Sequence, residues 1–510
     1  MDPLTRFALL GTTRGEPPEG AGALVDAIVQ KMDAVPIERR VLLAAGARAA
    51  EGTAGKRAMR SEQRFEGAPP EERAECSPAA ARLIRDQLGI QDEDLLREAL
   101  TLLDRAGRRL PHALLPEALQ VRDKKLRPAV RRVLGARGVW LARLNPNWAW
   151  ATEPDAPASI AALEKEWNDA VPAVRRRVLA EARGLDAVRA RSWLEATWGA
   201  EKADERAALL AILEQGLSLD DEPFVEAQLR DRSAGVRDAA QTLLARLDAS
   251  AFVRRMTERA DAMLEYRRSM LAALGKRATL EILPPEAVDA AADRDGLLAK
   301  PPSGAGARAF WLAAALAAVP PAHWTARFEA TAEELVSAAT KTDWAAAACE
   351  GWTRAALVRR DATWLVPLWD FWSNADAKVV EGRLAGAWLL AILEALPAAE
   401  AIARVEPMLS RPSEKLDLNA ALPTLPSPWP ASLGTRWLSV LRRELQTPTA
   451  QSLVVTSLRT AALALPPECL AEALAPFDHG ADADVPAATA LHSFVETVRF
   501  RHALTQEIQP

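Results

Sequence analysis

The chain has 510 residues, of which 49% are hydrophobic and 26% are charged, and its formal net charge at pH 7 is −5. That length allows about three ordinary domains or one long repeat array. The small net charge gives no global electrostatic argument for nucleic-acid binding. Three widely spaced cysteines, Cys76, Cys349 and Cys469, follow no metal-binding or redox spacing, so we expect a reducing compartment.

Composition also predicts the fold class. Alanine is abundant, tyrosine occurs once, and runs of β-branched and aromatic residues with a period of two are nearly absent. We therefore expect an all-α protein. Residues 1–10 lack the long apolar segment of a signal peptide, and the longest apolar run, 309–321, has the length of a core helix. These features predict a cytoplasmic protein without membrane spans.

In the first part of the chain, apolar periodicity predicts helices over 22–33, 36–50, 78–87, 92–106 and 111–121. The loop at 11–16, GTTRGE, has no preceding strand and no following Gly-Lys-Ser/Thr, so we do not interpret it as a phosphate-binding loop.

The stretch from Asp104 to Arg137 is strongly basic, with a net charge of +7. Its basic residues are Arg105, Arg108, Arg109, Arg122, Lys124, Lys125, Arg127, Arg131, Arg132 and Arg137. A concave helical face with this charge would contact nucleic-acid phosphates without reading bases. The alternative, which we favour, is a solvated or protein-facing surface.

A fixed period organises residues 163–275. Arg175, Arg206, Arg237 and Arg268 are each 31 positions apart, and apolar residues follow each of them at similar offsets. This period is typical of a repeat architecture and leaves room for two helices of about 12 residues with two short turns.

The clearest copy contains LRDRSAGVRDAAQTLLARL, residues 229–247, which resembles a HEAT repeat. The resemblance implies a ladder in which a turn aspartate pairs with an arginine six positions later. Asp231 with Arg237 and Asp169 with Arg175 have this spacing, whereas Arg206 and Arg268 lack such an aspartate. We favour an internal structural role for these arginines over a ligand-binding role, because a half-buried guanidinium needs a carboxylate.

Three segments carry a second resemblance: FALLGTTR (7–14), GARGVWLARLNPNW (135–148) and SLDDEPFVEAQLRDRS (218–233). Together they resemble an uncharacterised bacterial family, catalogued only as a domain of unknown function. Genes of that family often lie beside a MoxR-type AAA ATPase, a von Willebrand A-domain protein and a SWIM zinc-finger protein. The resemblance therefore implies such partners, and it transfers no catalytic residues.

A Gly- and Pro-rich segment at 284–309 predicts a boundary between two domains, residues 1–290 and 305–510. Beyond it the 31-residue register is lost, and ten of the sixteen tryptophans follow residue 310. We expect helices over 308–319, 329–340, 343–358, 363–373, 382–396, 432–446, 450–463, 467–475 and 487–505. The tryptophans indicate a packed core, with an exposed partner groove as the alternative. The Pro-rich loop 408–431 either docks over the helices or binds a ligand.

No constellation of catalytic, cofactor-binding or metal-binding residues is apparent. The five histidines form no His-x-x-x-His pair and no cluster with cysteine. Asp478, His479, Asp482 and Asp484 could hold a cation loosely, but a solvated loop is the simpler interpretation.

We therefore expect an α-solenoid of HEAT-like helix pairs, continued by a Trp-rich irregular helical region. Such a surface suits a non-enzymatic scaffold or adaptor for a MoxR-type AAA ATPase and von Willebrand A-domain system. The alternatives are a nucleic-acid-binding protein that uses the basic 105–137 stretch, and an enzyme of unrecognised type.

Overall fold

The computed structural model describes residues 26–27, 30–31, 35–53, 67–90, 92–152, 159–267, 278–302, 306–374, 382–411, 413–445, 453–475, 477 and 485–508. The chain divides into two compact units, Met1–Ala68 and Pro69–Pro510. The division thus differs from the domain boundary expected near 290–305. One hydrophobic core runs through that expected boundary, because Leu280, Leu297 and Trp311 belong to the same buried cluster.

The first unit contains one long described helix, α3 (Ile37–Thr53), where the sequence predicts a helix over 36–50. Val41 and Ala44 are buried, one turn apart on the same face. Leu42 and Leu43 remain 73% and 43% exposed.

The second unit begins with a small helical module, residues 69–152, that has its own core. Its elements are α4 (Pro78–Ile90), α5 (Glu93–Arg105), η2 (His112–Leu114), α6 (Leu115–Leu119), α7 (Arg127–Val133), α8 (Gly135–Arg143) and η3 (Pro146–Ala151). Asp92 begins α5 by accepting hydrogen bonds from the N–H groups of Asp94 and Leu95. Buried leucines, among them Leu100, Leu103 and Leu110, fill the centre.

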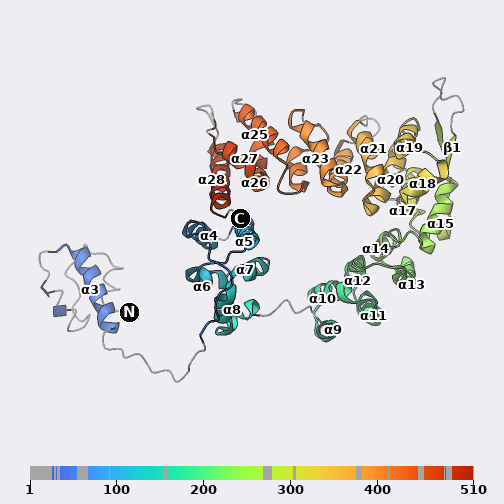
Figure 1. Ribbon diagram of the computed structural model, residues 1–510. Coiled ribbons are helices and arrows are strands. Elements are labelled where there is room, and N and C mark those ends of the chain that lie inside the picture. The colour runs from blue at the N-terminus through green and yellow to red at the C-terminus, as the bar shows by residue number, and fades with distance from the viewer. Residues whose placement is uncertain are drawn as a thin grey trace. The chain divides into compact units, whose positions relative to one another are not determined.

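The C-terminal helix, α28 (Val485–Glu507), packs against α4 and α5 of this module (Figure 1). Phe500, Leu504 and Ile508 complete the module's core. Arg501 links α28 to α5, because its Nε lies 2.7 and 2.9 Å from the two carboxylate oxygens of Glu98. Its Nη1 also donates to the carbonyl oxygens of Ala462 and Leu465, at 2.7 and 2.9 Å.

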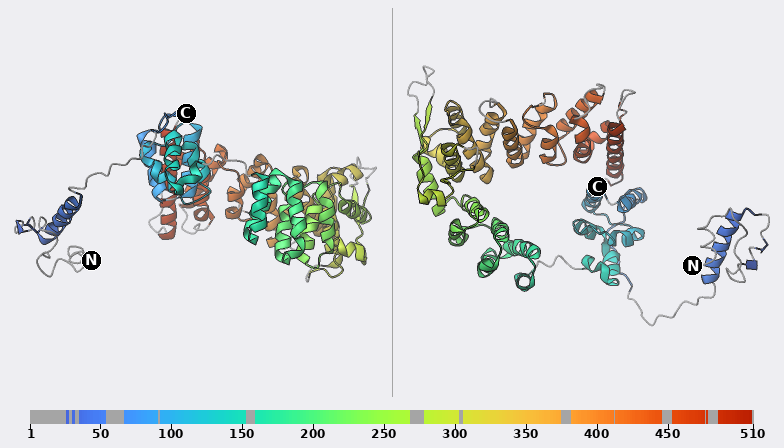
Figure 2. Two further views of the ribbon diagram at one scale, coloured as in Figure 1. Left: turned by 90° about the horizontal axis from the view of Figure 1, so that it is seen from below. Right: turned by 180° about the vertical axis from the view of Figure 1, so that it is seen from behind.

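Residues 159–261 form helices that pack on their neighbours in chain order, seen in green in Figures 1 and 2. They are α9 (Ile160–Asp169), α10 (Pro172–Leu185), α11 (Ala187–Thr197), η4 (Trp198–Ala200), α12 (Ala203–Ile212), η5 (Leu219–Asp221), α13 (Glu222–Ala227), η6 (Gln228–Arg230), α14 (Ala234–Leu244) and α15 (Ala251–Asp261). The side chains of Ser159, Asp186 and Ser250 cap α9, α11 and α15 at their N-termini. The expectation of helices in this region is confirmed.

A β-hairpin follows where the fourth copy of the repeat was expected. Strand β1 (Leu264–Arg267) pairs antiparallel with β2 (Thr279–Ile282), with Leu264 opposite Ile282. Leu280 and Ile282 are buried and alternate with exposed residues, the period-two pattern of a half-buried strand. The expectation of an all-α protein is therefore confirmed except for this short hairpin, and Arg268 lies outside the described residues.

The remaining helices continue the same core. They are α16 (Ala290–Arg294), α17 (Ala307–Ala318), α18 (Pro321–Phe328), α19 (Ala332–Ala339), α20 (Ala345–Arg359), α21 (Ala362–Asn374), α22 (Gly382–Ala395), α23 (Ala398–Val405), η8 (Glu406–Leu409), α24 (Leu418–Ala421), η9 (Leu422–Thr424), α25 (Ala431–Leu445), α26 (Leu453–Ala464) and α27 (Pro467–Ala473). None of the helices in the described part of the chain is both long and apolar enough to cross a bilayer.

Most tryptophans of this region are core residues. Trp324, Trp352, Trp364, Trp372 and Trp437 are each at most 1% exposed. The Pro-rich segment 408–431 docks over the helices and buries side chains of its own. They include Leu416, Leu418, Leu425 and Trp429. The tryptophans named above therefore lie in the core, the role favoured for them from the sequence, and the 408–431 segment follows the first of its two expected alternatives.

Candidate functional site

The evenly spaced arginines connect one helix pair to the next. The Nη2 of Arg206 lies 3.0 Å from the carboxylate of Asp231, and its Nη1 donates to the carbonyl oxygen of Glu201 at 3.0 Å. Arg237 donates to the main-chain oxygen of Asp231 at 2.8 Å, and not to its carboxylate. The Arg206 guanidinium thus donates hydrogen bonds to the turn that precedes its own helix and to the acidic residue of the following turn.

Arg175 repeats the arrangement with a partner other than the expected Asp169. Its Nη1 pairs with Glu201, which is 26 positions later. Arg175 also covers the ring of Trp167 at 5.3 Å, as Arg206 covers Trp198 at 5.8 Å. The structure therefore joins Arg175 to Glu201 and Arg206 to Asp231, and leaves Asp169 outside these pairs.

Aromatic contacts recur with the same period. Trp167 lies 6.2 Å from Trp193, and Trp198 lies 5.2 Å from Phe224, measured between ring centroids. Each member of the second pair is 31 positions after its counterpart in the first. Two successive helix pairs therefore use the same packing scheme.

Among the described residues, the most buried ion pair joins Arg183 to Asp221, and sequence reasoning, which treated Asp221 as a helix N-cap candidate, did not pair the two. Their side chains are 0% and 1% exposed. Arg183 Nη1 and Nη2 each lie 3.0 Å from one oxygen of the Asp221 carboxylate. Its remaining N–H groups donate to the carbonyl oxygens of Gln215, Ala187 and Leu213, each at 2.8 Å. All five guanidinium hydrogens are thus satisfied.

Burial by itself raises the pKa of the Asp221 carboxyl. Hydrogen bonds from Arg183, the Ser218 main-chain N–H and Arg191 outweigh burial, so its pKa lies below the usual value. A signal was present in the sequence, because Arg183 falls four positions after Leu179 on the apolar stripe of α10. A charged residue on an apolar stripe indicates a buried partner.

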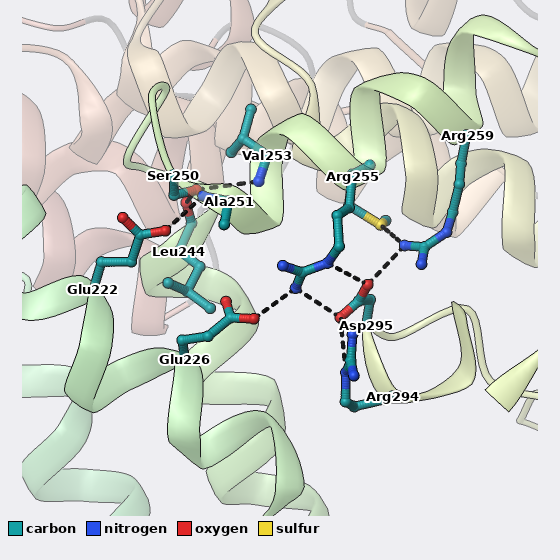
Figure 3. A network of polar contacts seen from close by, with 11 residues as sticks. Glu222, Glu226, Leu244, Ser250, Ala251, Val253, Arg255, Arg259, Arg294 and Asp295 are labelled. Atoms are coloured by element: carbon teal, nitrogen blue, oxygen red, sulfur yellow. Dashed lines mark hydrogen bonds and ion pairs between the residues drawn. The ribbon is translucent and has the colours of Figure 1, made fainter. Parts of the chain in front are cut away.

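A second buried carboxylate, Asp295, lies among three arginines (Figure 3). Arg255 binds it through Nε and Nη2, each at 2.9 Å, and Arg259 Nη1 approaches to 2.8 Å. Arg294 Nη2 lies 3.2 Å away, and Glu226 holds the other side of Arg255 at 2.7 Å. Burial raises the pKa of Asp295, but the hydrogen bonds from Arg255 and Arg259 lower it further than burial raises it. The carboxylate is therefore charged and fully paired at neutral pH.

A cavity of about 410 Å³ lies beside Asp295, and we name it the α14–α17–α20 cavity. Side chains of α15 and α17 supply its apolar lining, among them Phe252, Met256, Phe310, Ala314 and Ala317. Its rim carries Asp238, Gln241 and Thr242 of α14 together with Arg354 and Val358 of α20. Most of its lining is apolar.

The basic 105–137 stretch divides into differently placed groups. Arg109 is buried against the segment before α4, where it lies 3.0 Å from Glu75 and 3.6 Å from Glu71. Arg132 pairs with Asp104 at 3.1 Å. Arg137 is exposed, with Nη1 3.1 Å from His112 Nδ1. Arg127 and Arg131 are half-buried, and the Arg127 guanidinium covers the ring of Trp150 at 5.1 Å. Arg105 and Arg108 are exposed near the end of α5.

Arg122, Lys124 and Lys125 are exposed on the loop before α7. A hydrogen bond from the Lys125 main-chain N–H, with the nearby charges of Lys125 and Arg97, lowers the pKa of Asp123 in the same loop. Arg97 belongs to the first half of α5, whereas Arg105 ends that helix. Arg97 and Arg105 are eight residues apart, so they are separated by about 12 Å along the helix axis. The ten basic residues therefore form more than one surface.

Reactive side chains are scarce in the described part of the chain. It contains no group of three or more His, Cys, Asp or Glu residues suited to a metal. The loop residues Asp478, His479, Asp482 and Asp484 lie outside the described residues. Cys76, Cys349 and Cys469 are buried free thiols, and burial raises the pKa of each. These thiols are protonated at neutral pH and are weak nucleophiles.

Comparison with known proteins identifies a family for nearly the whole chain. The chain belongs to a family of unknown function (DUF5691), whose model matches residues 3–508. No curated protein and no solved structure matches the chain.

Proposed function

We propose that this member of a family without an assigned function is a non-enzymatic protein-interaction scaffold, built as a HEAT-like α-solenoid and continued by a Trp-rich helical region. The single observation that carries the proposal is the recurrence of one joint between successive helix pairs. Arg175 pairs with Glu201 and covers Trp167, and Arg206 pairs with Asp231 and covers Trp198. The arginine and the tryptophan recur after 31 residues and the carboxylate after 30.

Such joints suit a rigid interaction surface better than a reaction centre. The buried carboxylates Asp221 and Asp295 have lowered pKa values and accept several hydrogen bonds each. Catalytic acids and bases need a pKa near the operating pH, whereas these carboxylates stay charged. Stacked helix pairs expose long continuous faces, which many repeat proteins use to bind other proteins.

The partner that we propose is a MoxR-type AAA ATPase or a von Willebrand A-domain protein. This choice rests on the family resemblance of the segments at 7–14, 135–148 and 218–233. Affinity purification of the tagged full chain from its native host, under mild salt, tests it. We expect one of these two proteins to be recovered in stoichiometric amount, and recovery of no protein partner would count against the scaffold.

A nucleic-acid-binding function is the second candidate, favoured by the exposed cations Arg122, Lys124 and Lys125. Phosphate contacts release counterions, so the logarithm of the association constant would fall linearly with the logarithm of the salt concentration. Fluorescence anisotropy with a labelled duplex and a labelled single strand would measure that slope. The triple change of these residues to Glu should then lower both the affinity and the slope. The matched control is Lys341→Glu, a change at an exposed lysine of another segment.

A further inference from the structure

The α14–α17–α20 cavity is shaped and charged for a particular kind of partner. Phe310, Ala314 and Ala317 lie on α17 with spacings of four and three residues and are half-buried. They form one face of that helix, left partly uncovered between α14 and α20. Small alanines in such a row let another helix approach closely, as ridges packing into grooves do.

The polar groups of the lining need no ligand. Asp295 contributes to the wall, but Arg255, Arg259 and Arg294 already donate hydrogen bonds to its carboxylate (Figure 3). A small polar ligand would find no unpaired buried acceptor there. The cavity therefore favours apolar groups, and its volume of about 410 Å³ is within the range of binding pockets, about 300–1,000 Å³.

The rim adds a negative charge. Asp238 is exposed, and no side chain in the described part of the chain pairs with its carboxylate. Arg354 also lines the cavity and is 48% exposed, but its Nη2 lies 2.5 Å from Glu350 and its guanidinium covers Trp388 at 5.8 Å. The Arg354–Glu350 pair adds no net charge, so Asp238 supplies the unpaired negative charge of the lining.

We propose that this cavity binds the apolar face of an amphipathic helix from a protein partner, and that a Lys or Arg beside that face pairs with Asp238. The inference rests on the proposed scaffold function. It names the surface that binds the partner and the chemistry that the partner needs. It follows the common mode in which an amphipathic helix lies in an apolar groove.

Two labelled model peptides of about 14 residues test the proposal, each with leucine on one helical face and either lysine or glutamate on the other. Fluorescence anisotropy with the full chain should show saturable binding of the lysine peptide. Asp238→Lys should weaken binding of the lysine peptide by about tenfold, because the new lysine side chain repels the lysines of the peptide. The same change should improve binding of the glutamate peptide, because the charges are then opposite. Ala317→Trp should weaken binding of both peptides by filling the groove.

The matched control is Asp220→Lys, the same charge reversal at an exposed aspartate 18 residues earlier that does not line the cavity, and this variant should bind as the wild type does. Circular dichroism establishes that each variant is folded, and Asp238→Lys alters only an exposed side chain. Equal affinity of the wild type, Asp238→Lys and Ala317→Trp for the lysine peptide would overturn the proposal, as would no binding by the wild type.

Affinity purification of the native partner with the same variants distinguishes failure of this inference from failure of the scaffold function. If Ala317→Trp and Asp238→Lys still recover the partner that the wild type recovers, the cavity is not the docking site and the scaffold function stands. If the wild type recovers no partner, the scaffold function itself fails.

Discussion

Arg183 and Asp221 form a bidentate ion pair across two helix pairs, with both nitrogen–oxygen distances at 3.0 Å and both side chains withdrawn from solvent. The pair fixes the turn after α10 to the turn before α13, because Arg183 also holds three main-chain carbonyl oxygens. Buried ion pairs often contribute little net stability, but removal of one partner leaves the other charge buried without compensation, which is strongly destabilising.

Asp221→Asn should therefore lower the free energy of unfolding by about 3–5 kcal/mol, since it leaves the Arg183 charge uncompensated. Asp220→Asn is the control, because Asp220 is the exposed neighbour in the same turn. That change should stay within about 0.5 kcal/mol. Urea denaturation followed by circular dichroism measures both variants, and equal losses would show that the buried pair has no special role.

Acidification should destabilise the protein through its paired carboxylates. The pKa values of Asp221, Asp231 and Asp295 are lower in the folded protein than the ordinary 3.8 of aspartate. Their contribution is therefore fully present above about pH 4 and is lost as the pH falls through the lower, folded-state pKa values. Denaturation midpoints measured between pH 7 and pH 2 should fall steeply below about pH 4. A midpoint that rises on acidification would contradict the assigned direction.

Arg501→Met should loosen the contact between α28 and the first module. Arg501 is 4% exposed and binds Glu98 and two carbonyl oxygens, so its loss leaves several buried acceptors unpaired. We expect a cost of about 3–5 kcal/mol and faster amide hydrogen exchange in α4, α5 and α28. Arg499→Met is the control, because Arg499 is 60% exposed and pairs with Glu496 three residues away on the same helix. Unchanged exchange in Arg501→Met would show that apolar contacts alone hold the module.

Gly351→Ala should separate α17 from α20. A Cβ at Gly351 would lie 2.6 Å from Leu316 Cβ and 2.7 Å from the Ala313 carbonyl oxygen, so the two helices would have to move apart. Overpacking of this kind costs about 1–3 kcal/mol. Gly46→Ala in α3 is the control, because nothing lies within 4 Å of the added carbon. That change should be neutral or stabilise by about 0.5–1 kcal/mol. Thermal unfolding followed by circular dichroism compares the two.

The sequence predicts the helices well where their pattern is local. The apolar stripes of α21 and α25 place these two helices within a few residues of their observed ends, because local hydrogen bonds and an apolar face determine them. The hairpin β1–β2 was missed because each strand has only four residues, too few for a clear period of two.

The site was less accessible to sequence reasoning. The 31-residue period singled out Arg175 and Arg206, but the carboxylates that pair with them, Glu201 and Asp231, belong to the following helix pair. Such partners depend on how successive pairs stack, which no local spacing encodes. Asp295 was missed for the same reason, since Arg255 and Arg259 approach it from a helix some forty residues earlier.

The docking of α28 on the first module has a consequence for synthesis on the ribosome. Phe500, Leu504 and Ile508 supply part of a core whose other members lie between residues 76 and 151. At about 5–20 residues per second, tens of seconds pass between translation of the two segments. During that interval the nascent module exposes the apolar face that α28 later covers, which makes the module prone to aggregation until α28 is made.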